Sequence, residues 1–287
     1  MSGETKGSEG LDDLPPLRDV LAGAGLAADK RFGQHFLLDL NVTRKIARLA
    51  GPLEGRTVIE VGPGPGGLTR ALLEAGAHVV AVEKDPRFIP VLADLAAAAP
   101  GRLTVVEADA LAVDEDALAQ GRPAHIVSNL PYNVGTPLLV KWLTGPFRPV
   151  TMALMFQREV ADRIVAPPGG RDYGRLGVLA QAVCHAEKVM DLPARAFTPP
   201  PKVASAVIRL TPLAERPSDA LLQALQQVTQ AAFGQRRKML RSSLRSLGGE
   251  ALCQAAGLNP DARAETIPVA GFLAMARVLN EGPLQRA

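Results

Sequence analysis

An amide, a proline and an aromatic ring follow one another in the segment Asn129-Leu130-Pro131-Tyr132-Asn133, directly after a short apolar run. The side-chain oxygen of Asn129 can accept a hydrogen bond from an amine, Pro131 restricts the backbone before it, and Tyr132 can stack on a flat ring. Together these groups could hold the exocyclic amine of a planar base. A polar turn that stops at a proline is the alternative for this segment alone.

Residues 60–69 combine a carboxylate with a run of glycines between a predicted strand and a predicted helix. The glycines at 62, 64 and 66 allow a tight turn and a close approach of the backbone to a ligand. Gly62, Gly64 and Gly67 also satisfy G-x-G-x-x-G, a weak signal of a dinucleotide site. Glu60 extends the pattern to E-x-G-x-G-x-G, which is associated with S-adenosylmethionine (SAM). We therefore expect a nucleoside cofactor, with NAD and SAM both open at this point.

Two acidic residues follow the next predicted strands. Glu83 ends a strand, 21 residues after Gly62, and can accept hydrogen bonds from both hydroxyls of a ribose. This acid would repel a 2′-phosphate but does not separate NAD from SAM. Asp109 follows another strand and can accept from the exocyclic amine of adenine, although Asp is also a common turn residue.

The elements that must position these residues alternate between strand and helix. Strands are predicted at 57–61, 79–83, 103–107, 126–128 and 152–156, a helix at 68–75, and a late hairpin from 182–192 and 203–210. This alternation predicts an α/β fold with a mainly parallel sheet and helices on both faces. Since ligands of open α/β sheets bind at the carboxyl ends of the strands, the candidate residues are expected at one edge.

Both ends of the chain lack this alternation. Residues 1–29 are predicted to form a loosely ordered extension with a short helix after Pro15-Pro16. The segment 211–217, with two prolines and mixed charge, is typical of a linker. Everything beyond it is predicted to be helical, with one helix ending near Gly234. A second helix is predicted to carry an apolar stripe of Leu240, Leu244 and Leu247.

Positive charge is concentrated in this helical region. The chain has 287 residues and a formal net charge of +3, and residues 214–287 hold nine Lys and Arg against six Asp and Glu. No acidic residue lies between Asp219 and Glu250, the interval that contains Arg236, Arg237, Lys238, Arg241 and Arg245. Such clustering is typical of a nucleic-acid contact, with a solvated helix face as the alternative.

Composition excludes several other classes of protein. A hydrophobic content of 47% is sufficient for a core, yet no apolar run approaches the roughly 18 residues of a membrane span. The polar N-terminus lacks a secretory signal. Two cysteines and four scattered histidines provide neither a disulfide framework nor the spacing of metal ligands. We therefore expect a cytoplasmic protein without a membrane contact or a bound metal.

Taken together, the segments resemble the ribosomal RNA adenine N6,N6-dimethyltransferase family, in particular its bacterial small-subunit members. The resemblance runs from Lys30 to the C-terminus. Besides the segments above, it rests on residues 30–37 (KRFGQHFL), 173–176 (YGRL), 196–203 (AFTPPPKV) and 233–238 (FGQRRK). The related large-subunit adenine methyltransferases share much of the catalytic region, but the basic segment 235–238 fits the small-subunit members better. Where this chain has His35, family members often have Asn.

The resemblance implies a Rossmann-like class I SAM-dependent methyltransferase domain over 30–213, preceded by the extension 1–29 and followed by a small all-α rRNA-binding domain over 214–287. It implies SAM-dependent N6,N6-dimethylation of two adjacent adenines in a loop near the 3′ end of small-subunit (16S) ribosomal RNA, contributing to small-subunit biogenesis. The expected partners are this RNA and the precursor of the 30S subunit, and the enzyme is expected to be a monomer.

The expected site residues fall into three groups. The cofactor is expected at His35, Leu37, Gly62, Gly64, Glu83, Asp109 and Asn129. The catalytic segment comprises Asn129, Leu130, Pro131 and Tyr132, and Phe197 is a candidate for the second face of the adenine or, equally, a core residue. The RNA contact is expected at Arg236, Arg237, Lys238, Arg241 and Arg245.

Two other functions remain open on the sequence alone. An NAD-dependent oxidoreductase would use the glycine loop but has no use for residues 129–133 or for the basic tail. A non-catalytic RNA-binding or assembly factor would use the tail, although an intact segment 129–132 argues against a loss of activity.

Overall fold

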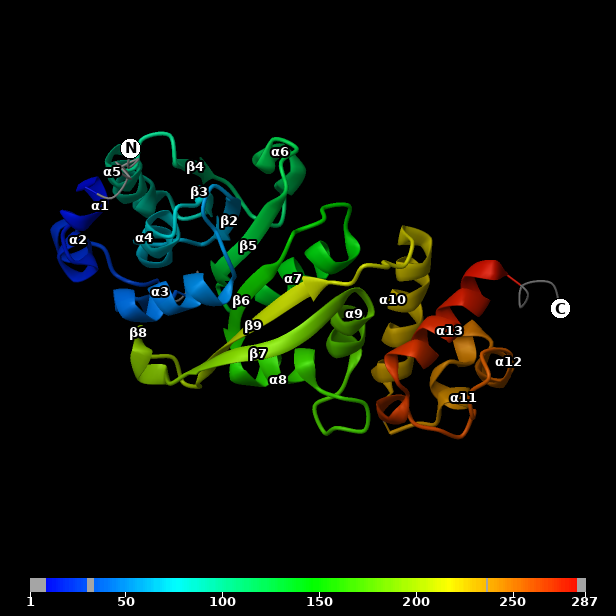
Figure 1. The fold of residues 1–287 in the computed structure, drawn as a ribbon. Coiled ribbons are helices and arrows are strands. Elements are labelled where there is room, and N and C mark those ends of the chain that lie inside the picture. The colour runs from blue at the N-terminus through cyan, green and yellow to red at the C-terminus, as the bar shows by residue number, and fades with distance from the viewer. Residues whose placement is uncertain (1–8, 30–33, 236, 283–287) are drawn as a thin grey trace. The chain divides into compact units, whose positions relative to one another are not determined.

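A seven-stranded sheet in the order β4-β3-β2-β5-β6-β9-β7 forms the centre of the computed structural model, which describes residues 9–29, 34–235 and 237–282 (Figure 1). Its strands are β2 (Thr57–Val61), β3 (His78–Glu83), β4 (Leu103–Glu107), β5 (Ala124–Asn129), β6 (Met152–Gln157), β7 (Cys184–Leu192) and β9 (Ser205–Pro212). The five strands from β4 to β6 pair in parallel. The α/β class predicted from the alternating pattern is therefore confirmed.

Burial explains why these segments form strands. Every residue of β2 is buried, and β3, β5 and β6 are buried except for one terminal residue each. Parallel strands covered on both faces are expected to be continuously apolar in this way.

Helices connect these strands. They are α3 (Leu40–Leu49), α4 (Gly67–Glu74), α5 (Ile89–Ala98), α6 (Glu115–Ala119), α7 (Gly135–Thr144), α8 (Arg158–Val165) and α9 (Arg175–Val183), with a 3₁₀ turn η2 (Pro86–Phe88).

A second, two-stranded sheet is made of β1 (Phe36–Leu37) and β8 (Phe197–Thr198), which pair antiparallel. A 3₁₀ turn, η3 (Ala194–Ala196), leads into β8. This small ribbon joins the start of the predicted catalytic region to the proline-rich segment near its end. Neither strand was predicted, because two-residue strands are too short to show a periodicity.

The N-terminal segment is more ordered than predicted. It contains α1 (Glu9–Asp12) and α2 (Leu17–Gly23). Leu11 joins the core cluster that includes α4 and β2, and Leu21 packs with Phe36, Phe88 and Leu92. The prediction of a loosely ordered extension is wrong for residues 9–29, because Leu11, Leu17 and Leu21 are buried against the rest of the chain. The short helix after the two prolines is confirmed.

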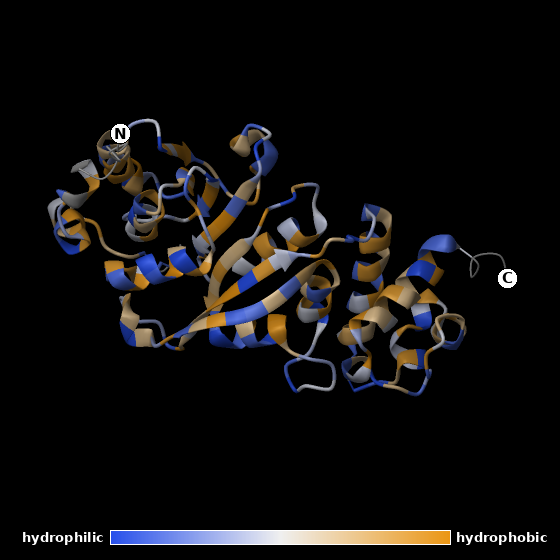
Figure 2. Cartoon of the chain, viewed as in Figure 1, coloured by the Kyte–Doolittle hydropathy of each residue, from blue (hydrophilic) through white to orange (hydrophobic). Residues whose placement is uncertain are grey.

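The chain divides into two compact units. The first comprises Met1–Leu139, Phe147–Arg158 and Lys188–Arg209, and the second comprises Val140–Pro146, Glu159–Glu187 and Leu210–Ala287. The second unit holds α8 and α9 together with α10 (Asp219–Gly234), α11 (Leu240–Ser243), α12 (Gly249–Ala255) and α13 (Val269–Glu281), with 3₁₀ turns η4 (Arg245–Leu247) and η5 (Ala264–Thr266). Figure 2 shows hydrophobic and hydrophilic residues on both α10 and α13, which pack against each other as amphipathic helices do.

The predicted helix with the stripe of Leu240, Leu244 and Leu247 is wrong. The segment forms the short helix α11 and then the separate turn η4, which ends at Gly248 with φ +106°. Leu240 and Leu244 are both fully buried, so the apolar spacing was a true burial signal. A glycine pair in the left-handed conformation and a break at Leu244 prevent a continuous helix.

No helix within the described ranges is long and apolar enough to cross a membrane.

Candidate active site

A pocket lies at the carboxyl ends of β2, β3, β4 and β5, the edge that the sequence predicted. It is lined by residues that follow each of these strands and by the segment around β1. Ten of the predicted residues line it: His35, Leu37, Gly62, Gly64, Glu83, Asp109, Asn129, Leu130, Pro131 and Tyr132. Phe197 is the one predicted pocket residue that does not. All of the lining belongs to the first unit.

The glycine turn between β2 and α4 brings the backbone close to its neighbours on both sides. Gly62 and Gly64 have φ values of +66° and +53°. A Cβ at Gly62 would lie 3.0 Å from the ring of Pro131, and one at Gly64 would lie 3.0 Å from the ring of Phe36. A side chain at either position would therefore be strained and would fill the space beside the ligand.

Glu83, the last residue of β3, fixes the conformation of this turn through hydrogen bonds. Its two carboxylate oxygens accept hydrogen bonds from the backbone N–H groups of Asp85, at 2.8 Å, and Gly64, at 3.0 Å. Burial raises the pKa of Glu83, and the hydrogen bonds to its carboxylate oppose that rise. Each carboxylate oxygen has a second lone pair. Glu83 can therefore fix the glycine turn and still accept two ribose hydroxyls.

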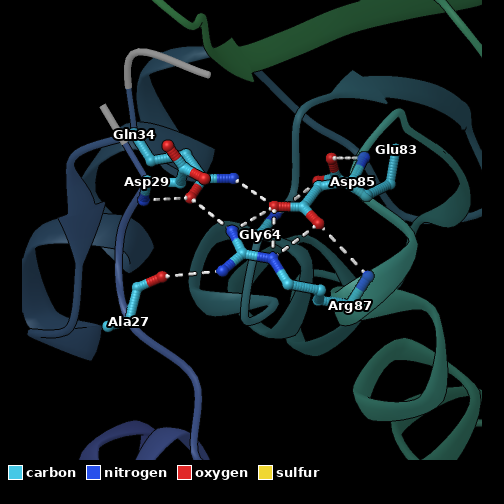
Figure 3. A network of polar contacts seen from close by, with 7 residues as sticks. All are labelled: Ala27, Asp29, Gln34, Gly64, Glu83, Asp85 and Arg87. Carbon is cyan, nitrogen blue, oxygen red and sulfur yellow. Dashed lines mark hydrogen bonds and ion pairs between the residues drawn. The ribbon is translucent and has the colours of Figure 1, made fainter. Parts of the chain in front are cut away.

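A clasp of three side chains, Gln34, Asp85 and Arg87, lies beside Glu83 and is joined to it through the backbone N–H of Asp85 (Figure 3). The carboxylate of Asp85, only 1% exposed, accepts from Gln34 Nε2 at 2.9 Å and from Arg87 Nη2 at 2.6 Å. These hydrogen bonds hold the pKa of the Asp85 carboxyl below its usual range, with Arg87 as the main cause.

The clasp also binds the segment that leads into β1. Gln34 Oε1 accepts from the backbone N–H of Asp29, and Arg87 Nη1 donates to the carbonyl of Ala27. The sequence analysis gave none of these three side chains a function. Asp85 carried a usable signal, since it is a carboxylate just beyond a strand end at the same edge as Glu83.

Glu60 is buried beneath the glycine turn and is 2% exposed. Its Oε2 accepts a hydrogen bond of 2.7 Å from the hydroxyl of Thr69 in α4. Burial raises the pKa of Glu60 to about 8, against the lowering effect of the Thr69 hydroxyl, and the nearby charge of Glu83 adds to the rise. Glu60 is therefore mainly protonated at neutral pH and ties β2 to α4.

Asp109 lines the pocket two residues beyond the end of β4. Its Oδ1 accepts from the backbone N–H of Leu111 at 2.9 Å, and its Oδ2 lies 2.8 Å from Lys84 Nζ. The turn interpretation and the ligand interpretation are thus both compatible with its position. The carboxylate is partly exposed and lines the pocket, so an amine donor can reach it.

Asn129 ends β5 with its side-chain amide in a defined orientation. Asn129 Nδ2 donates to the backbone carbonyl of His35 at 3.0 Å. A carbonyl can only accept, so the atom that faces it must be the amide nitrogen. Oδ1 then points elsewhere, and no residue that the structure describes donates to it. The backbone carbonyl of Leu130 likewise receives no hydrogen bond within those ranges, whereas the carbonyl of Pro131 accepts from Val134 and Gly135 at the start of α7.

Tyr132 presents a half-buried ring next to these two free acceptors. Its hydroxyl shares a hydrogen bond of 2.6 Å with Ser205 Oγ in β9. Burial raises the pKa of Tyr132, so the ring is a neutral phenol. The imidazole of His35 packs beside it, with the ring centroids 5.2 Å apart and a tilt of 33°. His35 Nδ1 lies 2.8 Å from the carbonyl of Pro199 and therefore carries a proton.

Phe197 occupies the core and not the pocket. Its side chain is 3% exposed and packs in the cluster with Leu37, Ile46 and Leu192. In β8 it pairs with Leu37 of β1, so its ring lies under the ribbon. Of the two interpretations given for Phe197, this placement supports the core residue and gives no support to a stacking partner.

The basic cluster lies in the second unit. Arg237, Lys238, Arg241 and Arg245 are all exposed, and Arg241 Nη1 lies 3.1 Å from Asp261 Oδ1. Arg236, predicted with them, lies outside the described residues. No group of acidic, histidine or cysteine side chains in the described ranges is arranged to hold a metal ion.

The pocket fits an adenosine-containing cofactor. The turn at Gly62 and Gly64 leaves space that a Cβ would fill. Glu83 retains two acceptor sites for a ribose, and Asp109 stands beyond it beside the apolar Ala110 and Leu111 that also line the pocket. Fold and site together define a Rossmann-like enzyme that binds an adenosine-containing cofactor at the carboxyl ends of its parallel strands.

Comparisons with known proteins give the family. The model of the family described as ribosomal RNA adenine dimethylase matches residues 25–281. The chain belongs to this family. It is therefore an rRNA adenine dimethyltransferase that uses SAM, and the alternatives of an NAD-dependent oxidoreductase and of a non-catalytic factor are set aside.

Individual relatives agree with this assignment. The chain is 70% identical over 266 residues to the ribosomal RNA small subunit methyltransferase A of Phenylobacterium zucineum, covering 93% of each protein. It is 71% identical over 255 residues to the protein of the same name from Caulobacter vibrioides, covering 89% of this chain and 98% of the relative. Among solved structures, the 23S rRNA methyltransferase ErmE shares 28% identity with a TM-score of 0.65, over 85% of this chain and 99% of ErmE.

Proposed function

We propose that this enzyme dimethylates N6 of adjacent adenines in a loop of small-subunit (16S) ribosomal RNA, on the precursor of the 30S subunit. Identity supports the choice of subunit, because the relatives named for the small subunit are 70% and 71% identical, whereas the enzyme named for 23S rRNA is 28% identical. The observation that carries the chemistry is the pair of unengaged acceptors, Asn129 Oδ1 and the Leu130 carbonyl, beside the ring of Tyr132.

The cofactor would be held by the residues at the strand ends. Glu83 would accept hydrogen bonds from the ribose hydroxyls, Asp109 would accept one from the adenine amine, and the turn at Gly62 and Gly64 would give the backbone close access. Leu37 and His35 close the pocket from the β1 side. When bound, SAM supplies a methyl group on a sulfonium, which is already a strong electrophile.

The enzyme's own residues then have to activate a poor nucleophile. The lone pair of an adenine amine is delocalised into the ring. Asn129 Oδ1 and the Leu130 carbonyl would accept hydrogen bonds from the N–H groups of the amine, which localises the lone pair and stabilises the positive charge that develops on nitrogen. The bond from Asn129 Nδ2 to the His35 carbonyl fixes the amide in the required orientation. The methylated amine is briefly cationic and acidic, so water can take its proton and no strong base is needed.

Tyr132 would provide the stacking face for the target base. Its hydroxyl bond to Ser205 and its contact with His35 hold the ring in place, and base–aromatic stacking contributes ~1–3 kcal/mol. A base must leave its own stack to enter the pocket, which favours an adenine in a loop.

RNA affinity would come from the C-terminal region, residues 214–287. Its exposed cations Arg237, Lys238, Arg241 and Arg245, with Arg236, would bind phosphates and position the enzyme without choosing the base. We propose that the enzyme acts as a monomer in the cytoplasm, where ribosomal subunits are assembled.

Methyl transfer to isolated subunits tests this function. Small subunits from a strain that lacks the modification, and large subunits from the same strain, are incubated with the enzyme and tritiated SAM. Incorporation into the small subunit alone, recovered as N6,N6-dimethyladenosine, is the expected result. Incorporation into the large subunit, or recovery of monomethyladenosine only, would contradict the proposal.

A further inference from the structure

A second hollow in the first unit has no place in the mechanism above. It is a groove of about 770 Å³ between the N-terminal segment, the start of α3 and the end of β7. Its apolar lining includes Leu14, Leu17, Leu38, Leu40, Val42 and Met190, and its cationic lining consists of Arg18, Arg70 and Arg195. A groove that combines an apolar wall with three guanidinium groups has the lining of an anion site and not of a simple packing gap.

Arg70 gives the strongest indication that the groove receives a ligand. This α4 side chain is 5% exposed, and its Nη1 donates to the backbone carbonyl of Pro15 at 2.7 Å. Its Nε is fully buried and has no partner, and no described residue accepts from Nη2. An unpaired buried donor on a charged group is destabilising. Because Arg70 lines the groove, a phosphate bound there could supply an acceptor for this guanidinium.

The two other arginines are exposed, and neither has a polar partner within the described ranges. The two carboxylates of the groove are engaged elsewhere. Asp39 accepts from the backbone N–H of Asn41 as the N-cap of α3, and Asp191 lies 3.7 Å from both Arg158 Nε and Lys188 Nζ. With three arginines against two aspartates, the lining of the groove keeps a net positive charge.

The groove and the cofactor pocket share a wall. Phe36 and Leu37 of β1 line the pocket, while the next residues, Leu38 to Leu40, line the groove together with Thr198 of β8. An RNA strand whose adenine enters the pocket carries a phosphate at every neighbouring nucleotide. The β1–β8 ribbon thus contributes residues to both the pocket and the groove.

We infer that Arg18, Arg70 and Arg195 form an accessory site for the phosphodiester backbone of the RNA substrate, at nucleotides next to the target adenine. The inference rests on the proposed function, because it requires the RNA to be the bound anion. The apolar wall would contact the ribose and base of the same nucleotide. In this arrangement α2, which carries Arg18, is part of the substrate site, which gives the N-terminal segment a function.

Salt-dependent binding separates a phosphate contact from general attraction. The double variant R18A/R195A removes two exposed charges from the groove. The control R56A/R122A removes two exposed charges that precede β2 and β5, at the amino ends of parallel strands and so at the opposite edge of the sheet. Binding to unmethylated small subunits is measured by sedimentation over a series of KCl concentrations, and SAM affinity is measured by calorimetry.

For R18A/R195A we expect the Kd for subunits to rise ~10-fold at moderate salt and the slope of log K against log salt to fall by about one to two. SAM affinity should equal that of the wild type. R56A/R122A should leave the slope unchanged. A third variant, R70K, keeps the charge but loses the two-pronged donor, and its Kd should rise ~3–10-fold at an unchanged slope.

Each contrary result has a distinct meaning. If R18A/R195A binds subunits with the wild-type slope, or if the control pair lowers the slope equally, the groove is not a phosphate site. That result would leave the proposed function intact as long as the wild-type enzyme still methylates the subunits. If the wild-type enzyme transfers no methyl group to small subunits, the proposed function and the accessory site are both overturned.

Discussion

The amide of Asn129 makes two separate contributions, since Nδ2 holds the His35 carbonyl and Oδ1 is left to accept from an amine. Asn129→Ala should reduce methyl transfer by at least ~10²-fold, the scale of losing one positioned polar group in a transition state. SAM affinity should fall far less than methyl transfer, because the glycine turn and Glu83, which are expected to hold the ribose, are untouched. Single-turnover transfer and calorimetry measure the two effects separately.

Asn41→Ala, at an exposed position of α3, serves as the control for preparation and folding, and should transfer methyl groups at the wild-type rate. Turnover of Asn129→Ala at that same rate would remove Asn129 from the mechanism.

Glu60 makes the stability of the protein depend on pH. The folded state keeps the Glu60 proton up to a pKa of about 8, whereas the unfolded chain loses it near 4.5. Between these values the folded state binds more protons, so the free energy of unfolding falls as pH rises, by about 1.4 kcal/mol per pH unit. Glu60→Gln keeps an acceptor for the Thr69 hydroxyl and cannot ionise. The variant should therefore be more stable than the wild type at pH 8.

Urea unfolding of both proteins at pH 5 and pH 8, without cofactor, checks this expectation. The difference in unfolding free energy should grow with pH in favour of the variant. A difference that stays constant would show that Glu60 is ionised in the folded protein.

At the residue scale, the sequence predicted positions better than contacts. Asn129, Glu83 and Asp109 were found because each polar residue follows a strand of a parallel sheet, which fixes its edge. Phe197 could not be placed, because an aromatic residue beside a proline-rich loop has the same pattern whether it lies in a core or in a pocket. The clasp was missed because Gln34 and Asp85 are 51 residues apart, and nothing local links them.

The connection between β3 and α5 acts as a unit with the segment that precedes β1, through Asp85 and Arg87. Arg87→Met keeps an apolar stem beside Phe88 and removes the donors that bind Asp85. Asp85 would then lose its main stabilising hydrogen bonds and support Glu83 less firmly. We expect the KM for SAM to rise ~3–10-fold with kcat nearly unchanged, because the lost interaction is equally strong in the ground state and in the transition state.

Arg56→Met, at the amino end of β2, is the matched control. Steady-state kinetics with saturating RNA distinguish the outcomes, and a fall in kcat at an unchanged KM would assign Arg87 to the chemistry and not to the positioning of Glu83.

Helices and strands were predictable from the sequence where burial imposes a regular spacing of apolar residues. Strands β2, β4 and β6 begin at the predicted residues, and each of them starts a short segment rich in apolar residues. The break between α11 and η4 was not predictable, since Leu240 and Leu244 are buried at helical spacing and the backbone nevertheless turns at Gly248. Tertiary packing of a short segment outweighed its local periodicity.

Across the two units, we propose that the chemistry belongs to the first unit and that the second unit supplies a separate part of the RNA affinity, so the two properties should respond to different changes. The triple variant of Arg237, Lys238 and Arg245 to Ala removes three exposed cations of the second unit. It should weaken binding to small subunits, and should lower the salt slope by about two to three. SAM affinity should be unchanged, because every residue that lines the cofactor pocket lies in the first unit.

Arg241→Ala provides the contrast within the same cluster. Arg241 is partly neutralised by Asp261, 3.1 Å away. The loss of one full phosphate contact changes the salt slope by about 0.7–0.9, so the removal of Arg241 should change the slope by less than this amount. Sedimentation binding over a KCl series gives both slopes. An unaltered slope in the triple variant would assign these cations to solvation, and RNA affinity would then have to come from the first unit alone.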